Sequence, residues 1–261
     1  MSSHIDMAAN LRQVQARIQA AAGRAGREPG EVTLVAVTKT HPLEVVQSAY
    51  QAGVRHFGEN RVEEALEKIA PFEAWLAGRP ADSPPPAWHM VGHLQSRKAG
   101  DALAHFHTIH SVDSLKLAER LNRLAEREAQ SVLSGRLPMP ILLECNVSGE
   151  ASKYGFALSA WREDRQVRRA FFETVRDILT FPWIHLQGLM TMAPIVADPQ
   201  QARPIFVALR ALRDALAEAY PHVEWCHLSM GMTDDFEVAV EEGATLVRIG
   251  RALFGPRLCE L

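Results

Sequence analysis

The feature that most constrains the fold is an alternation of eight short apolar segments with longer amphipathic patterns. The short segments are apolar on consecutive positions, which is typical of strands buried on both faces of a parallel sheet. They span residues 33–38, 56–60, 89–94, 107–112, 141–147, 185–192, 225–230 and 245–250. The spacing predicts helices over 7–22, 43–51, 62–75, 114–133, 168–179, 199–219 and 234–242, with a short one near Ser96.

Eight strand and helix units predict a single (β/α)8 TIM barrel domain over residues 1–261, with an extra N-terminal helix. A doubly wound open sheet is the structural alternative, but no GxGxxG motif follows any strand, which disfavours a dinucleotide fold. The proline-rich segment 77–88 is interpreted as a surface loop, because the strand pattern resumes directly after it.

Composition excludes several classes of protein. The net charge is -3 and no long basic tract is present, so we expect no nucleic-acid partner. No segment approaches the roughly 18 apolar residues of a membrane span, and the N-terminus has no signal-peptide pattern, so we expect a cytoplasmic protein with no membrane partner.

The cysteines and histidines give no sign of a metal site. Cys145, Cys226 and Cys259 are widely spaced with no CxxC pair, and the first two lie in strand-like segments that suggest core positions. The 11 histidines show no metal-ligand spacing. His89, His107 and His185 open predicted strands, which places them at the end of the barrel opposite its active-site mouth.

Functional residues of a barrel are expected where its strands end, and two charged residues stand out there. Lys39 ends the first strand and Arg248 lies within the eighth, although burying a charge in apolar sequence is costly. Lys39 is either a lysine whose amine reaches water from the rim or a Schiff-base lysine with a lowered pKa. Asp113 and Asp234 are interpreted as helix caps.

Two glycine-bearing turns follow the seventh and eighth strands, "SMGMTDD" at 229–235 and "GRALFG" at 250–255. The phosphate site of many barrels is built from these two loops, although such glycines can equally be ordinary turn residues. Together with Lys39 and Arg248, the loops would hold an aldehyde-bearing ring at three points.

Five segments resemble a known family: "VAVTKTHP", "FGENRVEE", "WHMVGHLQSRK", "GLMTMAP" and "LSMGMTDDFEVAVEEGATLVRIGRALFG". They resemble the pyridoxal phosphate homeostasis proteins, the YggS/PROSC family, from about residue 32 to residue 255. That family is similar to the N-terminal barrel of alanine racemase standing alone. The resemblance therefore implies an alanine-racemase N-terminal-domain-like barrel with no C-terminal β domain.

By this resemblance the chain carries pyridoxal 5'-phosphate (PLP) as a Schiff base on Lys39. Many relatives have a small hydroxyl residue where this chain has Arg251, so a side-chain bond to the phosphate is left open there, whereas a backbone N–H contact is expected in either case. Arg248 is expected to face the pyridine nitrogen of PLP, with Asn60 and His93 near the ring. The residues implied to bind the phosphate are Ser229, Gly231, Met232, Gly250 and Arg251.

The implied function is to hold PLP, buffer it and deliver it to PLP-free enzymes, without robust catalysis. A cationic Arg248 leaves the pyridine nitrogen unprotonated, which weakens the electron sink that carbanion chemistry needs. Racemases of similar fold also take an acid/base tyrosine from the second domain of a partner subunit, and its absence here predicts a monomer.

Two enzyme functions remain open. A PLP-dependent racemase or related enzyme would use Lys39 with Tyr154 or a histidine as its second base, and the role of Lys153 beside Tyr154 is undecided. A class I aldolase-like barrel would form its imine with a sugar phosphate instead.

Overall fold

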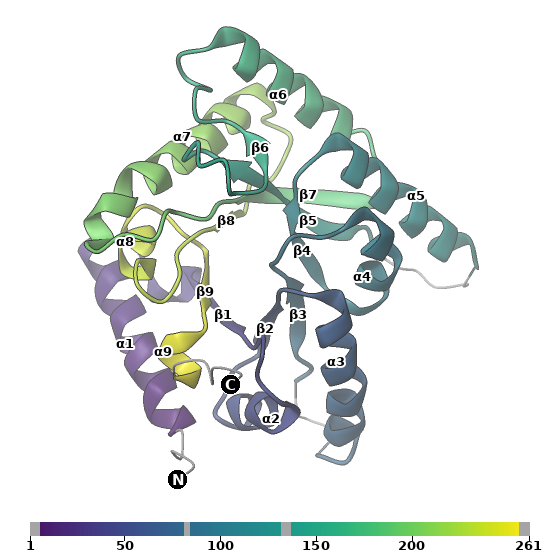
Figure 1. The fold of residues 1–261 in the computed structure, drawn as a ribbon, viewed down its shortest axis with the longest axis vertical. Coiled ribbons are helices and arrows are strands. Elements are labelled where there is room, and N and C mark those ends of the chain that lie inside the picture. The colour runs from purple at the N-terminus through teal and green to yellow at the C-terminus, as the bar shows by residue number, and fades with distance from the viewer. Residues whose placement is uncertain (1–5, 81–83, 132–136, 256–261) are drawn as a thin grey trace.

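A computed structural model describes residues 6–80, 84–131 and 137–255. Eight parallel strands form a closed ring in the order β1, β2, β3, β4, β5, β7, β8 and β9 (Figure 1). The pairing of β4 with β5 and of β1 with β9 closes the ring, which confirms the barrel and excludes the open sheet. The strands are β1 (Thr33–Val37), β2 (His56–Glu59), β3 (Ala87–Met90), β4 (Thr108–Val112), β5 (Met139–Asn146), β7 (Ile184–Met190), β8 (His227–Ser229) and β9 (Leu246–Ile249).

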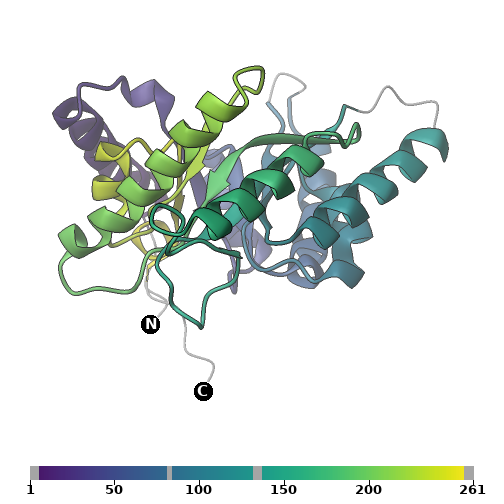
Figure 2. The same cartoon turned by 90° about the horizontal axis from the view of Figure 1, so that it is seen from above.

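Helices surround the strands (Figures 1 and 2). They are α1 (Met7–Arg24), α2 (Leu43–Gln51), α3 (Val62–Ala77), α4 (Ala99–His105), α5 (Leu115–Ser131), α6 (Arg165–Ile178), α7 (Arg203–Ala219), α8 (Phe236–Glu241) and α9 (Arg251–Phe254). Short 3-10 turns lie at η1 (Pro29–Glu31), η2 (Ser96–Lys98) and η3 (Pro199–Ala202). The α1 helix is the predicted addition before the first strand.

Local side chains explain several helix starts. The Asp6 carboxylate accepts a hydrogen bond from the Ala9 N–H, and Asp164 caps α6 in the same way. At α5 the cap is Ser114, whose hydroxyl accepts from the Leu117 N–H. The prediction that Asp113 caps this helix is therefore wrong by one residue.

Several elements differ from the sequence prediction. The β3 strand covers Ala87–Met90 rather than 89–94, so His89 lies inside the strand. The two-residue β6 (Phe156–Ala157), which pairs with the end of β5, was not predicted. The α9 helix begins at Arg251, where the sequence suggested a turn. Parts of the predicted 77–88 loop and 114–133 helix, and Cys259, lie outside the described residues.

The core has two parts. The larger cluster fills the space between the strands and the helices. A smaller cluster of Val35, Val91, Leu142, Met190 and Leu246 is packed separately, and Val91 also lines the cavity described below. This small cluster therefore forms apolar support next to the cavity.

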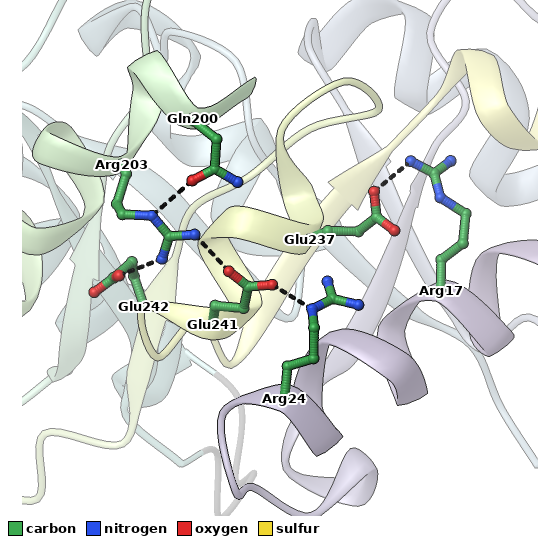
Figure 3. A network of polar contacts seen from close by, with 7 residues as sticks. All are labelled: Arg17, Arg24, Gln200, Arg203, Glu237, Glu241 and Glu242. Carbon is green, nitrogen blue, oxygen red and sulfur yellow. Dashed lines mark hydrogen bonds and ion pairs between the residues drawn. The ribbon is translucent and has the colours of Figure 1, made fainter. Parts of the chain in front are cut away.

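The α1 helix packs on α8 and α9. A set of ion pairs, here called the surface ion-pair network, joins α1 to α8 and α8 to the start of α7 (Figure 3). Its N···O distances lie between 2.5 and 2.9 Å. Its members are Arg17, Arg24, Arg203, Glu237, Glu241 and Glu242.

Two further observations concern the described residues. Among them, no helix is both long enough and apolar enough to cross a membrane. Cys145 is buried as predicted, whereas Cys226 is exposed because it precedes β8 rather than lying within it.

Candidate functional site

A cavity of about 390 Å³ opens at the carboxyl ends of the strands, within the size range of small-molecule sites. Of the residues predicted for the site, neither Ser229 nor Gly231 lines it. Figure 2 shows the segment 147–164, between β5 and α6, projecting from the barrel, and this segment brings Tyr154 to the cavity. The predicted residues that do line the cavity are Lys39, Asn60, His93, Met232, Arg248, Gly250 and Arg251.

Lys39 sits in a tight turn directly after β1. The next residue, Thr40, has φ of 65°, a left-handed conformation that is uncommon for a residue other than glycine. The Thr40 N–H donates to Glu64 Oε1 on α3, and the His41 N–H donates to the Thr38 carbonyl. The backbone on both sides of Lys39 is therefore held in one conformation, which points its side chain at the cavity.

A buried lysine supports this turn from behind. Lys68 Nζ donates to the Thr38 carbonyl at 2.8 Å, to Glu59 Oε1 at 2.8 Å and to Glu64 Oε1 at 2.7 Å. The Thr38 hydroxyl donates to the same Glu59 oxygen at 2.6 Å. Burial raises the pKa of Glu59, while Lys68 and the hydrogen bonds oppose that rise. We call Thr38, Glu59, Glu64 and Lys68 the lysine-turn clamp.

Arg248 reaches the cavity from β9, where it pairs in register with Val35 of β1. Its Nη1 donates to Ser229 Oγ at 2.7 Å and its Nη2 donates to the Thr191 carbonyl at 2.9 Å. Burial lowers the pKa of Arg248 to about 10, although Asp235 and Glu144 act in the opposite direction. The guanidinium therefore remains charged at neutral pH.

The loop after β8 differs from the expected phosphate cradle. Ser229 is fully buried and its hydroxyl binds Arg248, so its position gives no support to a side-chain contact with phosphate. The Met232 N–H already donates to Asp235 Oδ1 at 2.6 Å. Gly231 has φ of 93°, and a Cβ there would lie 2.6 Å from the Cβ of Ala239, so only glycine fits.

Asp234 and Arg251 connect the two glycine-bearing loops. Their side chains form an exposed ion pair at the edge of the cavity. The prediction that Asp234 acts as a helix cap is therefore wrong, because its carboxylate is engaged by the loop after β9. Arg251 begins α9, and its charged end faces Asp234.

An aromatic pair forms another wall. His93 and Tyr154 stack with ring centroids 3.9 Å apart and an interplanar angle of 13°. His93 Nδ1 also lies 3.2 Å from Asp113 Oδ2, which is the contact that replaces the predicted capping role of Asp113. Lys153 lies outside the lining, since its amine donates to the Met192 carbonyl and pairs with Glu150.

Sequence reasoning missed Glu144, the acidic residue of β5 that lines the cavity. Its side chain is almost fully buried, and in the described part of the chain its Oε2 has no hydrogen-bond partner. Burial and the nearby Asp113 raise the pKa of Glu144 to about 7, although Arg248 opposes this. A single acid inside the apolar run 141–147 is the same signal that identified Lys39 and Arg248.

The sequence and the fold are similar to those of known proteins. A model of the alanine racemase N-terminal domain family matches residues 9–257. A pyridoxal phosphate homeostasis protein of Pseudomonas aeruginosa is 42% identical over 251 residues, which are 96% of this chain and 96% of that relative. The chain belongs to the pyridoxal phosphate homeostasis protein family.

Solved structures agree with this membership. PipY of Synechococcus elongatus, in a structure with PLP bound, is 33% identical with a TM-score of 0.75 and covers 96% of this chain and 100% of its own. Alanine racemase of Clostridium difficile has a TM-score of 0.65 at 15% identity, over 96% of this chain and 58% of that one. The latter similarity supports the barrel fold alone.

Proposed function

We propose that this member of the pyridoxal phosphate homeostasis protein family holds PLP as a Schiff base on Lys39. In this role it buffers the free aldehyde and delivers PLP to PLP-free enzymes, without robust catalysis of its own. The observation that carries the proposal is the meeting of Lys39 and Arg248 in one cavity at the paired ends of β1 and β9. The PLP-bound structure of the relative PipY supports the choice of ligand.

The residues of the cavity fit PLP chemically. The Lys39 amine can add to the aldehyde carbon, and loss of one water then leaves a C=N bond. Arg248 is fixed by two side-chain hydrogen bonds and can face the pyridine nitrogen. Gly250 and Arg251 line the cavity where we expect the phosphate. Because the Met232 N–H is bonded to Asp235, we assign the phosphate chiefly to the loop after β9.

Arg248 favours holding over turnover. PLP supplies an electron sink when its ring nitrogen is protonated, and a guanidinium beside that nitrogen cannot provide the proton. Arg248 keeps its charge at neutral pH because its pKa of about 10 is well above 7. The cavity therefore suits reversible capture of an aldehyde better than proton abstraction from an amino acid.

Borohydride reduction tests the attachment site. Purified protein is incubated with PLP, reduced, digested and analysed by mass spectrometry, and we expect the pyridoxyl mass on Lys39. Lys153→Ala is the matched control, because its amine is already paired near the same mouth, and it should label normally. Labelling that persists unchanged in Lys39→Ala would overturn the assignment, and a sugar-derived mass would favour the aldolase function.

Delivery is tested with a PLP-free acceptor enzyme. We expect loaded protein to restore acceptor activity both with and without a trap for free aldehyde. Recovery that disappears when the trap is present would limit the function to buffering. We further propose a monomer in the cytoplasm, and sedimentation velocity would test the monomer.

A racemase is the second candidate function. The observation in its favour is Tyr154, which is 54% exposed and stacks on His93 at the cavity wall. Incubation with L-alanine and other amino acids distinguishes the two functions. We expect no isomerisation above background, and a rate that vanishes in both Lys39→Ala and Tyr154→Phe would establish the enzyme.

A further inference from the structure

A line of hydrogen bonds crosses the barrel interior and ends at Arg248. His56 Nδ1 lies 3.0 Å from His89 Nε2, and His89 Nδ1 lies 2.9 Å from His110 Nε2. His110 Nδ1 lies 2.9 Å from Ser229 Oγ, the atom that accepts from Arg248. These residues come from β2, β3, β4 and β8, and we call His56, His89, His110 and Ser229 the histidine chain.

The direction of each bond follows from Arg248. A guanidinium only donates, so the Ser229 hydroxyl must accept from it and send its own proton elsewhere. Ser229 is fully buried, and among the described residues its other polar neighbour is His110 Nδ1. The opposite polarity would leave the Ser229 proton without an acceptor, at the cost of a buried unsatisfied donor.

That first assignment fixes the tautomers of all three imidazoles. If His110 Nδ1 accepts, its proton is on Nε2 and is donated to His89 Nδ1. His89 then carries its proton on Nε2 and donates it to His56 Nδ1. The chain then ends at the Nε2–H of His56, a partly exposed residue at the start of β2.

The environment keeps the imidazoles neutral. Burial lowers the pKa of His110 well below its ordinary value, and His89 and the positive Arg248 lower it further. Burial, then the neighbouring histidines, lowers the pKa of His89 to about 3, and burial followed by His107 lowers that of His56. The order of donors and acceptors therefore persists across the physiological pH range.

We propose that His110 is a positioning residue for PLP binding, because it orients the Ser229 hydroxyl so that a lone pair always faces Arg248. Held by this hydroxyl and by the Thr191 carbonyl, the guanidinium keeps one orientation beneath the cavity. His89 and His56 continue the chain, and their tautomers follow from that of His110. The consequence for PLP rests on the proposed function, whereas the tautomers do not.

Nitrogen NMR of the histidines tests the chain directly. The full protein is labelled with ¹⁵N-histidine and measured without PLP between pH 6 and 8. We expect His89 and His110 as neutral Nε2–H tautomers over the whole range and the neutral form of His56 as the same tautomer, assigned with His56→Gln, His89→Gln and His110→Asn spectra. A neutral Nδ1–H form of His110, or a charged His89 or His110 at pH 7, would overturn the inference even if PLP binds normally.

A pair of variants at one position tests the effect on PLP. His110→Leu removes the acceptor, and we expect the dissociation constant of PLP to rise about tenfold or more. His110→Asn offers an amide oxygen to Ser229 and should bind within about threefold of wild type. His185→Gln is the control, because His185 is exposed outside the chain. Equal affinity of folded His110→Leu and wild type would refute the positioning role.

Should His110→Leu fail to fold, Ser229→Ala gives the same answer. Its smaller side chain removes the hydroxyl between His110 and Arg248, so we expect both weaker PLP binding and a mixed tautomer at His110. Unchanged values of both quantities would refute the inference. Loss of PLP binding in wild type itself would instead count against the proposed function and leave the tautomer result standing.

Discussion

The surface ion-pair network and the lysine-turn clamp use the same chemistry in opposite surroundings. In the network the side chain of Arg24 is 53% exposed and that of its partner Glu241 is 17% exposed, so water competes for the guanidinium (Figure 3). In the clamp the side chain of Lys68 is 7% exposed and that of Glu59 is fully buried. The comparison shows that burial, and not the number of ion pairs, decides how much stability is lost when one partner of an ion pair is removed.

The largest expected effect comes from breaking the clamp. Lys68→Ala leaves Glu59 buried without its cation and should lower the free energy of unfolding by about 3 to 5 kcal/mol in urea titrations. Lys98→Ala is the matched control, since that lysine pairs with Glu63 at the surface and should cost less than about 1 kcal/mol. Similar losses in both variants would contradict the comparison.

Glu144 should show an intermediate effect that depends on pH. Its folded pKa of about 7 is above the ordinary value of 4.5, so the fold favours the protonated acid. That stabilisation is complete below the ordinary value and is lost as the pH rises through 7. Glu144→Gln should therefore be more stable than wild type at pH 8, by up to about 3 kcal/mol, and equal to it near pH 4.

Urea titrations from pH 4 to 8 would measure this difference. Glu63→Gln serves as the control, because the pKa of Glu63 is lowered by its bond with Lys98 and its titration lies at the acid end. If the free energy of unfolding of Glu144→Gln varied with pH in parallel with that of wild type, titration of Glu144 would not be the cause of the pH dependence.

The smallest effect is expected in the surface network. Arg24→Ala should change the free energy of unfolding by less than about 1 kcal/mol, because the ion pair is exposed to solvent. The difference should shrink further between low and high salt, since exposed charges are screened. If Arg24→Ala lowered the free energy of unfolding by more than about 2 kcal/mol regardless of salt, the network would contribute to stability as a buried ion pair does, like the clamp.

The fold could be predicted because its signals are local and repeated. Eight apolar segments separated by amphipathic ones were enough to give the barrel, and Leu43–Gln51 was predicted to the residue. The errors lie at short elements that depend on contacts between distant residues, as at β6, whose two residues pair with the end of β5. Such a pairing leaves no periodic trace in the sequence.

The site could be predicted only in part. Lys39 and Arg248 were visible because a charge in apolar sequence is unusual, and both line the cavity. Ser229 was placed correctly at the end of its strand, yet the direction of its hydroxyl depends on Arg248 and His110, which are 19 and 119 residues away. The clamp could not be predicted for a similar reason, since Lys68 lies on α3 and the burial of its side chain depends on how that helix packs.

The register of β1 with β9 has a consequence for how the protein matures on the ribosome. Val35 pairs with Arg248, so β1, which meets β2 early, waits for more than 200 residues before it meets β9 on its other side. Chains emerge from the N-terminus at about 5 to 20 residues per second, so this interval lasts roughly ten seconds or more. In a nascent chain Lys39 is therefore made long before Arg248, and the cavity that both residues line is completed only after β9 has been synthesised.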